Sequence, residues 1–233
     1  MTAGGRALVI AHRGASGYEV ENSLAAFRAA GPAGADAVEL DVHATADGAL
    51  VVHHDETVDG VHHIAHATRA QIQSHHLANG EPVPLLEEAL AAVGRKLQVF
   101  VEVKSLAPRF DDVLFAAFDR GPNPAGYTVH SFDHRIIRRL GEKRPALPRG
   151  VLSSSYLLRP LAAMADAGAA VLWQERSVLD EPLVRTVHGA EGRVMVWTVD
   201  RPEEMRRFLA LGVDGLVTNL PDIGRRAVDS FAP

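Results

Sequence analysis

The sequence predicts an α/β fold, a (β/α)8 or TIM barrel with a small insertion after its second strand. Three observations lead to this prediction. Short apolar, β-branched runs alternate with longer segments of helical periodicity along the whole chain. Eight such pairs fit within 233 residues, which is typical of a closed barrel. The glycine-rich turn of an open dinucleotide-binding sheet is absent from the sequence.

Each predicted strand is a short run rich in Val, Leu, Ile or Ala and bounded by polar or turn-forming residues. Strands of this kind are buried on both faces in a parallel barrel, so they need not alternate strictly between apolar and polar residues. In chain order the predicted strands are Ala7 to Ala11, Ala37 to Val42, Leu97 to Val103, Tyr127 to His130, Gly150 to Ser153, Ala170 to Trp173, Arg193 to Val199 and Gly215 to Val217.

The predicted helices follow the strands and carry recognisable start and stop signals. We expect Asn22 to cap the first helix, prolines to open the last two, and Gly94, Gly168 and Gly212 to end three of them. The predicted helices are Ser23 to Ala30, Leu85 to Val93, Asp111 to Arg120, Arg135 to Glu142, Leu157 to Ala167, Glu181 to His188, Pro202 to Leu211 and Pro221 to Ser230.

One stretch departs from the alternation of strands and helices. Between Val42 and Leu85 the sequence has an Asp47-Gly48 turn, a short strand at Leu50 to His53 and a polar, histidine-rich segment. We interpret residues 55–84 as an insertion over the barrel mouth, because loops at that end of the strands surround the active sites of barrel enzymes. Residues 1–233 otherwise predict a single domain.

Composition excludes several classes of protein. The chain is 47% hydrophobic and 23% charged and has no cysteine, which removes cysteine nucleophiles and thiolate metal sites. Its net charge of -5, without a basic block, argues against nonspecific nucleic-acid binding. No export signal or membrane-spanning run is evident, so we expect a cytoplasmic protein without stable membrane anchoring. Composition does not indicate an oligomeric state.

Charged residues stand in strands that a barrel should bury. The period of two places Glu39 and Asp41 on one face of the second strand, and Glu102 and Lys104 on one face of the third. Three carboxylates that converge from adjacent strands repel one another, and a divalent cation would keep them ionised. Oxygen ligands favour Mg²⁺ or Ca²⁺. Alternatively, Glu102 pairs only with Lys104, and Asp41 caps a loop.

The surrounding residues suit a phosphate group. Arg13 and Lys104 can donate hydrogen bonds to phosphoryl oxygens, and His12 and His54 can act as acid and base in phosphoester cleavage. His43 continues the pattern of Glu39 and Asp41, so its role stays open. We interpret the remaining histidines as structural or surface residues, namely His53, His62, His63, His66, His75, His76, His130, His134 and His188.

At this point the sequence resembles the glycerophosphodiester phosphodiesterase family. The resemblance extends from about residue 8 to residue 222, and the set of motifs is more specific than any one of them. The matching segments are Ala11-His12-Arg13-Gly14-Ala15, Glu21-Asn22-Ser23, Val38-Glu39-Leu40-Asp41-Val42, Val51-Val52-His53-His54-Asp55, Val101-Glu102-Val103-Lys104, Ser131-Phe132, Val196-Trp197-Thr198-Val199 and Gly212-Val213-Asp214-Gly215 with Thr218-Asn219.

The resemblance implies a barrel enzyme that hydrolyses small glycerophosphodiesters to glycerol 3-phosphate and an alcohol. It implies one metal ion, Mg²⁺ or Ca²⁺, and a pocket in which Trp197 lies against the glycerol part of the substrate. An alternative role for Trp197 is packing at the barrel rim. The residues with implied roles are Glu39, Asp41 and Glu102 for the metal, His12 and His54 for acid/base catalysis, and Arg13 and Lys104 for phosphate.

Two other functions remain open at this stage. A related phospholipase D-like barrel enzyme would act on lysophospholipids or sphingolipids, and it would need an apolar lip for the acyl chain, which the sequence does not reveal. A noncatalytic binding protein would have kept the barrel and lost activity. The presence of His12, His54 and all three carboxylates argues against that second alternative.

Overall fold

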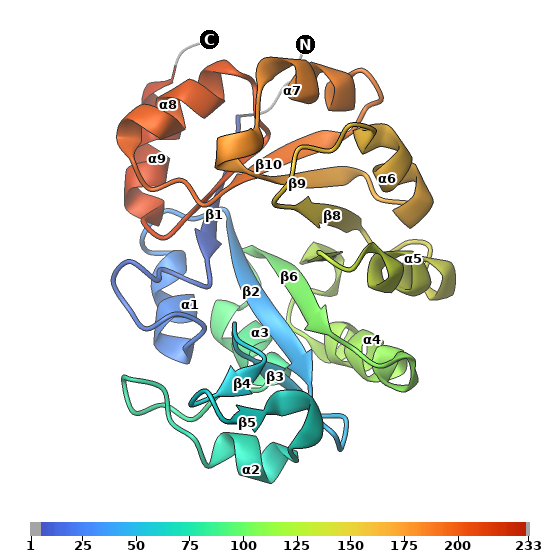
Figure 1. Cartoon of the computed structure of the whole chain (residues 1–233). Helices are drawn as coiled ribbons and strands as arrows, with labels where there is room; N and C mark the ends of the chain where they lie inside the picture. Colours follow the sequence, from blue (N-terminus) through green and yellow to red (C-terminus); the bar gives the residue numbers. More distant parts are fainter. Residues whose placement is uncertain (1–5, 232–233) are drawn as a thin grey trace.

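The protein is a closed barrel of eight parallel strands surrounded by helices, as the sequence predicts (Figure 1). The structure is a computed structural model that describes residues 6–231. Each barrel strand pairs with its neighbours in chain order, and the last strand pairs with the first, which closes the ring. The barrel strands are β1 Leu8–His12, β2 Ala37–Ala44, β6 Gln98–Ser105, β7 Tyr127–Ser131, β8 Arg149–Ser153, β9 Val171–Glu175, β10 Arg193–Trp197 and β11 Gly215–Thr218.

The helices that follow the strands form the outer layer of the molecule (Figure 1). Their apolar faces and the outward-facing residues of the strands make the larger of the buried clusters. The outer helices are α1 Leu24–Ala30, α3 Leu86–Val93, α4 Asp111–Arg120, α5 His134–Lys143, α6 Pro160–Ala167, α7 Glu181–His188, α8 Pro202–Ala210 and α9 Pro221–Ser230.

The predicted start of the first helix is wrong. Ser23 caps α1, because its side chain accepts a hydrogen bond from the Ala26 amide, and Asn22 does not. Asn22 has a φ of +56° and donates its side-chain amide to Asp41 instead. Helix α6 also begins later than predicted, at Pro160, because a proline disfavours helical geometry in the residue before it. The predicted stops at Gly94, Gly168 and Gly212 are confirmed by positive φ values at all three glycines.

A second, smaller cluster fills the barrel interior. Most of its side chains come from strands β8 to β11, and all of them are apolar. The inward-facing residues toward the carboxyl ends of β1, β2, β6 and β7 are ionisable. The interior is therefore apolar on one side and polar on the other. The buried residues of this cluster are Ile10, Ala37, Phe100, Leu152, Val171, Trp173, Met195 and Val217.

The insertion after β2 folds into a lobe of its own beside the end of that strand (Figure 1). Strand β3, Leu50–Val52, returns antiparallel to β2, and the β4–β5 hairpin, Thr57–Val58 and His62–His63, follows it. The 3-10 turn η1, Ile64–His66, and helix α2, Arg69–Gln73, complete the lobe. A separate small core of Val51, Val58, Ile64, Ala67, Ile72 and Val83 stabilises it.

Within residues 6–231, the helices are all too short or too polar to cross a lipid bilayer.

Candidate active site

A pocket of about 230 Å³ opens at the carboxyl ends of the barrel strands. Seven of the eight predicted site residues line it: His12, Arg13, Glu39, His54, Glu102, Lys104 and Trp197. The eighth, Asp41, is buried and contacts Arg13 and Lys104. The structure also places His130, Phe132, Leu152, Trp173 and Val217 in the pocket wall.

The register of the barrel brings the polar residues together. His12 on β1 lies opposite Glu39 on β2, and Asp41 lies opposite Glu102 on β6. Glu102 in turn lies opposite His130 on β7. Because parallel strands in register point equivalent side chains to the same side, these residues form adjacent positions on the inner wall of the barrel.

Asp41 is the centre of the charged network. Its carboxylate lies 3.2 Å from the Arg13 Nε atom and 3.3 Å from the Lys104 Nζ atom, and it accepts a 2.8 Å hydrogen bond from Asn22. Burial alone would raise the pKa of Asp41, but Lys104 and Arg13 beside it hold that pKa below its usual value. Asp41 is therefore an anion held between two cations that line the pocket.

Glu39 and Glu102 have the opposite behaviour. Burial raises the pKa of Glu39 well above its usual range, and the Asp41 and Glu102 carboxylates add to the increase. Burial and Asp41 also raise the pKa of Glu102 to about 7, although Lys104 lies 2.8 Å from its Oε1 atom. Without another positive charge, these two carboxyl groups do not ionise together easily.

These donors fit a divalent cation. Glu39, Glu102 and His130 each offer a ligand atom, and the three atoms lie within 4.8 Å of one another at buried positions. The Oδ1 atom of Asp41 is also buried without a hydrogen-bond partner. A bound cation would keep Glu39 and Glu102 ionised, because its positive charge would lower their raised pKa values.

His12 is held in one orientation by a chain of hydrogen bonds. Its Nδ1 atom lies 2.7 Å from the Asn219 Oδ1 atom, and the Asn219 amide donates to Asp200 at 2.7 Å. Because this second bond fixes which Asn219 atom is oxygen, the His12 proton lies on Nδ1 and the Nε2 atom has a free lone pair. Burial, assisted by the nearby Arg13 charge, lowers the pKa of His12. His12 is thus suited to accept a proton.

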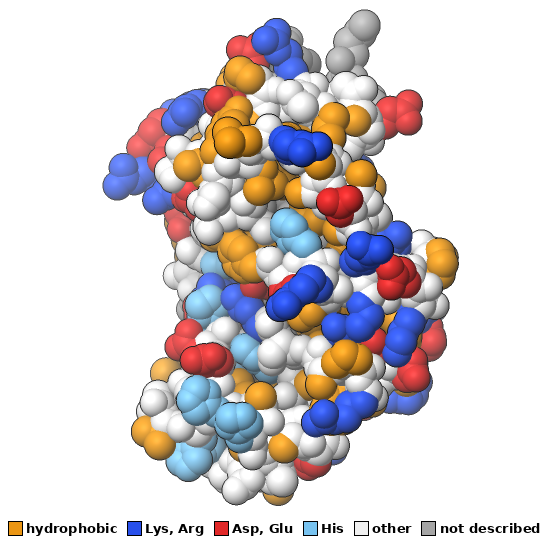
Figure 2. Space-filling view, turned by 45° about the vertical axis from the view of Figure 1, so that its right-hand side comes forward, with side chains coloured by type: hydrophobic (Ala, Val, Ile, Leu, Met, Phe, Trp, Pro, Cys, Tyr) orange, Lys and Arg blue, Asp and Glu red, His pale blue; other side chains and the backbone are white. Residues whose placement is uncertain are grey.

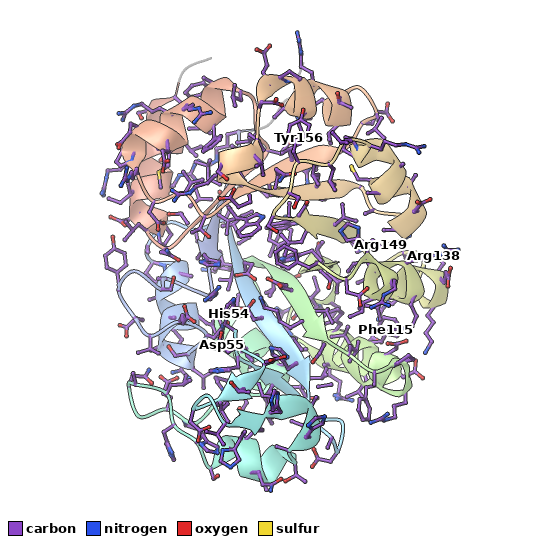
Figure 3. The ribbon with its side chains drawn as sticks, in the orientation of Figure 1. His54, Asp55, Phe115, Arg138, Arg149 and Tyr156 are labelled. Atoms are coloured by element: carbon purple, nitrogen blue, oxygen red, sulfur yellow. The ribbon has the colours of Figure 1, made fainter. Side chains whose placement is uncertain are left out.

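His54 has a carboxylate partner and more contact with solvent. It stands at the start of the insertion, where its Nδ1 atom lies 2.8 Å from the Asp55 Oδ1 atom and its side chain is 37% exposed. Both residues lie beside β2 in Figure 3. The Asp55 carboxylate accepts a hydrogen bond from Nδ1 and so orients the His54 ring at the pocket.

The loop after β1 brings Arg13 to the pocket. Arg13 has a φ of +55°, and Gly14 has a φ of +82°. The Arg13 amide donates to a Glu39 oxygen at 3.1 Å, and its guanidinium binds Glu21 at 2.8 Å. A Cβ atom at Gly14 would meet the Ala26 backbone at 2.6 Å, so this turn requires glycine.

His130 is a pocket residue that the sequence prediction assigned to a structural role. Its side chain is 2% exposed, and its ring stacks on Trp173 with centroids 4.2 Å apart and planes 7° from parallel. Burial lowers the pKa of His130 to about 3, so the imidazole is neutral and forms no ion pair with Glu39 at 4.0 Å. The alternation of side chains along β7 indicates this position, because His130 and Phe132 are two residues apart and therefore point to the same side, where both line the pocket.

His43, whose role was open, lies outside the pocket. Its ring is buried, with its nitrogens 3.1 Å from the Ser105 hydroxyl and 3.3 Å from the His54 carbonyl. The His43 ring therefore contacts the backbone of His54 and does not line the pocket. The other histidines of the insertion are on the surface, where Figure 2 shows a group of them on the lower lobe: His62, His63, His66 and His76 are exposed.

The opposite wall of the pocket is apolar. Trp197 meets Phe132 edge to face at a centroid distance of 5.7 Å, with Leu152 and Trp173 in the same wall. Phe132 is 46% exposed, and the loop after β8 exposes Tyr156 by 41% and Leu158 by 90%. Apolar side chains at this mouth therefore exist where the sequence revealed none, and Tyr156 lies across the barrel from His54 in Figure 3.

The fold and the pocket together define a TIM-barrel protein with two histidines and buried carboxylates gathered at the carboxyl ends of its strands. A model of the "Glycerophosphoryl diester phosphodiesterase family" matches residues 12–223. The chain belongs to this family and is an enzyme of the phosphodiesterase class.

Relatives of similar length support this assignment. A "Glycerophosphodiester phosphodiesterase" of Caldanaerobacter subterraneus is 34% identical over 93% of this chain and 96% of that protein. A crystal structure of a glycerophosphodiester phosphodiesterase from Parabacteroides distasonis has a TM-score of 0.87 at 26% identity and covers 97% of this chain and 98% of its own. A phosphodiesterase from Oleispira antarctica, solved with the product sn-glycerol-3-phosphate, shares the fold with a TM-score of 0.88 at 24% identity. The match covers 97% of this chain and 98% of the Oleispira chain.

Proposed function

We propose that the protein hydrolyses glycerophosphodiesters to glycerol 3-phosphate and an alcohol, using a divalent cation and two histidines. The observation that carries this proposal is one pocket that contains both His12 and His54 together with buried Glu39 and Glu102. Its small volume suits the head of a small diester. The presence of sn-glycerol-3-phosphate in the Oleispira protein supports the same product class.

The division of roles between the histidines follows from their partners. His12 has a lowered pKa and a free Nε2 lone pair, so it takes the proton from the attacking hydroxyl. His54, supported by Asp55, gives a proton to the departing alcohol oxygen. The attacking group is either water or the glycerol hydroxyl next to the ester. The family resemblance implies the second route, in which the hydroxyl displaces the alcohol to form a cyclic phosphate and water then opens this ring.

The charged residues hold the phosphate between these histidines. Arg13 and Lys104 line the pocket, and Asp41 keeps both cations in place. Glu39, Asp41 and Glu102 would hold the metal, which would supply positive charge to the phosphoryl oxygens. Trp197 and Phe132 would contact the apolar carbons of the glycerol or the alcohol. The insertion, residues 55–84, would form one side of the entrance because His54 stands at its start.

The proposal is tested by measuring release of glycerol 3-phosphate from a panel of glycerophosphodiesters. The assay is run with EDTA and with Mg²⁺, Ca²⁺ or Mn²⁺ restored, and with Glu39→Ala as the inactive control. We expect activity that EDTA removes and a divalent ion restores. Undiminished activity in EDTA, or in Glu39→Ala, would reject the metal assignment.

A second candidate substrate is a lysophospholipid, and the exposed apolar side chains at the mouth favour testing it. Phe132 lines the pocket itself, and Tyr156 and Leu158 extend from the next loop along the barrel. Release of choline from lysophosphatidylcholine is measured beside release from glycerophosphocholine. A preference for the glycerophosphodiester supports the proposed function, whereas a preference for the lysolipid that Phe132→Ser abolishes would replace it.

A further inference from the structure

His130 has contacts that a packing residue does not need. It comes from β7, its side chain is almost fully buried, and within residues 6–231 its Nδ1 atom has no hydrogen-bond partner. A buried polar group without a partner costs roughly 1 to 3 kcal/mol. His130 also lines the pocket, where its other ring nitrogen, Nε2, lies 4.0 Å from the Glu39 Oε1 atom.

The ring of His130 is fixed by packing. Trp173 on β9 reaches across β8 because the intervening residue is Gly150, where a Cβ atom would meet the Trp173 indole nitrogen at 2.6 Å. The indole then lies flat on the imidazole. This contact holds the His130 Nε2 atom 4.0 Å from the Glu39 Oε1 atom. Two ligands at about 2.1 Å from a common ion lie up to about 4.2 Å apart, so the separation suits coordination.

We propose that His130 is a nitrogen ligand of the divalent ion, beside Glu39 and Glu102, and that the site consequently prefers Mn²⁺ or Co²⁺ to Ca²⁺. Oxygen ligands alone would favour Mg²⁺ or Ca²⁺. A neutral imidazole adds a donor that first-row transition ions accept and that Ca²⁺ rarely uses. The inference rests on the proposed metal dependence.

The test measures the metal site directly, without substrate. Purified full-length protein is stripped of metal and titrated with MnCl₂ or CaCl₂ by calorimetry, and the Mn²⁺ complex is examined by electron spin-echo modulation for a coordinated nitrogen. We expect tighter binding of Mn²⁺ than of Ca²⁺ and a nitrogen signal in the natural protein. In His130→Phe, which keeps a ring against Trp173, we expect loss of the nitrogen signal and about 10- to 100-fold weaker Mn²⁺ binding with little change for Ca²⁺.

Two further variants make the outcome decisive. His130→Leu repeats the loss of nitrogen in case the Phe variant does not fold, and thermal unfolding of each apo protein monitors folding. His63→Phe, at an exposed position of the insertion, is the matched control and should bind both ions like the natural protein. A nitrogen signal that survives in both His130 variants, or equal preference for the two ions, overturns this inference alone. Absence of any ion binding to the natural protein overturns the proposed metal dependence as well.

Discussion

At the scale of single residues, the two histidines of the pocket differ most in what their Nδ1 atoms contact. His12 meets a neutral amide, held by Asp200, while His54 meets the Asp55 carboxylate. The proposed division into base and acid follows this difference in partners. This asymmetry gives each histidine a separate experimental signature.

Removal of the acid should be tolerated by a substrate whose leaving group needs no proton. We expect His54→Ala to lower kcat for an alkyl glycerophosphodiester by about 10² to 10⁴-fold, and to leave turnover of a p-nitrophenyl glycerophosphodiester much closer to the natural rate. His12→Ala should impair both substrates, because the base is needed in either case. Release of p-nitrophenol and of glycerol 3-phosphate measures the two reactions. An equal loss on both substrates in His54→Ala would contradict its role as the acid.

The pH dependence of the base follows from its burial. Burial lowers the pKa of His12 below 6.5, so the neutral form persists as the pH falls to that value and is lost only below it. We therefore expect the acidic limb of kcat/KM to have an apparent pKa below 6.5. The profile is measured in His54→Ala with the p-nitrophenyl substrate, which removes the other histidine. A midpoint above 6.5 would show that a different group is titrating.

At the scale of elements, the alternation along strands allowed most of the site to be predicted. Eight strands follow from apolar runs, and Glu39, Asp41, Glu102 and Lys104 follow from the parity of charged residues within them. The role of Trp197 was predicted only from the family resemblance. His130 escaped prediction because a lone histidine in a strand has no charged neighbour of the same parity on β7. Its importance depends on Gly150 and Trp173, which are distant in sequence and meet it only after the barrel closes.

The wrong cap at Asn22 has a similar cause. Asn and Ser are both good helix caps, so the sequence of that turn does not distinguish them. The choice is made by Asp41 on the next strand, which engages the Asn22 side chain and leaves Ser23 to cap α1. Tertiary contacts of this kind are invisible to local propensity.

The turn after β1 gives a stability prediction at this scale. Gly14→Ala places a Cβ atom against the Ala26 backbone and forces a positive φ on alanine, so we expect a loss of about 3 kcal/mol in the free energy of unfolding. Gly212→Ala is the matched control, because it has φ +84° and open space around the new atom, and should cost about 1 kcal/mol. Urea denaturation compares the two. Equal losses would show that the close approach to α1 can relax.

At the scale of the whole molecule, the polar residues of the barrel interior oppose folding in the absence of a cation. Burial raises the pKa of both Glu39 and Glu102, and the Asp41 carboxylate adds to the increase in each. Catalytic sites often carry such unfavourable groups, and the remainder of the barrel compensates for them.

Metal binding should accordingly stabilise the fold. An ion at 100 times its Kd adds about 2.7 kcal/mol, which for a chain of this size raises Tm by about 5 to 10 °C. Glu39→Gln should unfold without metal at a temperature equal to or above that of the natural apo protein, because a carboxylate repulsion is gone, and should lose the response to added ion. Calorimetric melts with EDTA and with MnCl₂ measure both quantities. A Glu39→Gln melt that still rises with MnCl₂ would place the ion elsewhere.

The division of the barrel interior into a polar side and an apolar side has an evolutionary consequence. The groups proposed for bond cleavage come from β1, β2, β6 and the start of the insertion. In the apolar wall, Leu152 belongs to β8, Trp197 belongs to β10 and Phe132 follows β7. Mutations that reshape the apolar wall can therefore accumulate without disturbing proton transfer. A new head group becomes accessible by gradual change at two or three positions, and a mutant library restricted to Phe132 and Leu152 would explore that change while each member keeps its reactive groups.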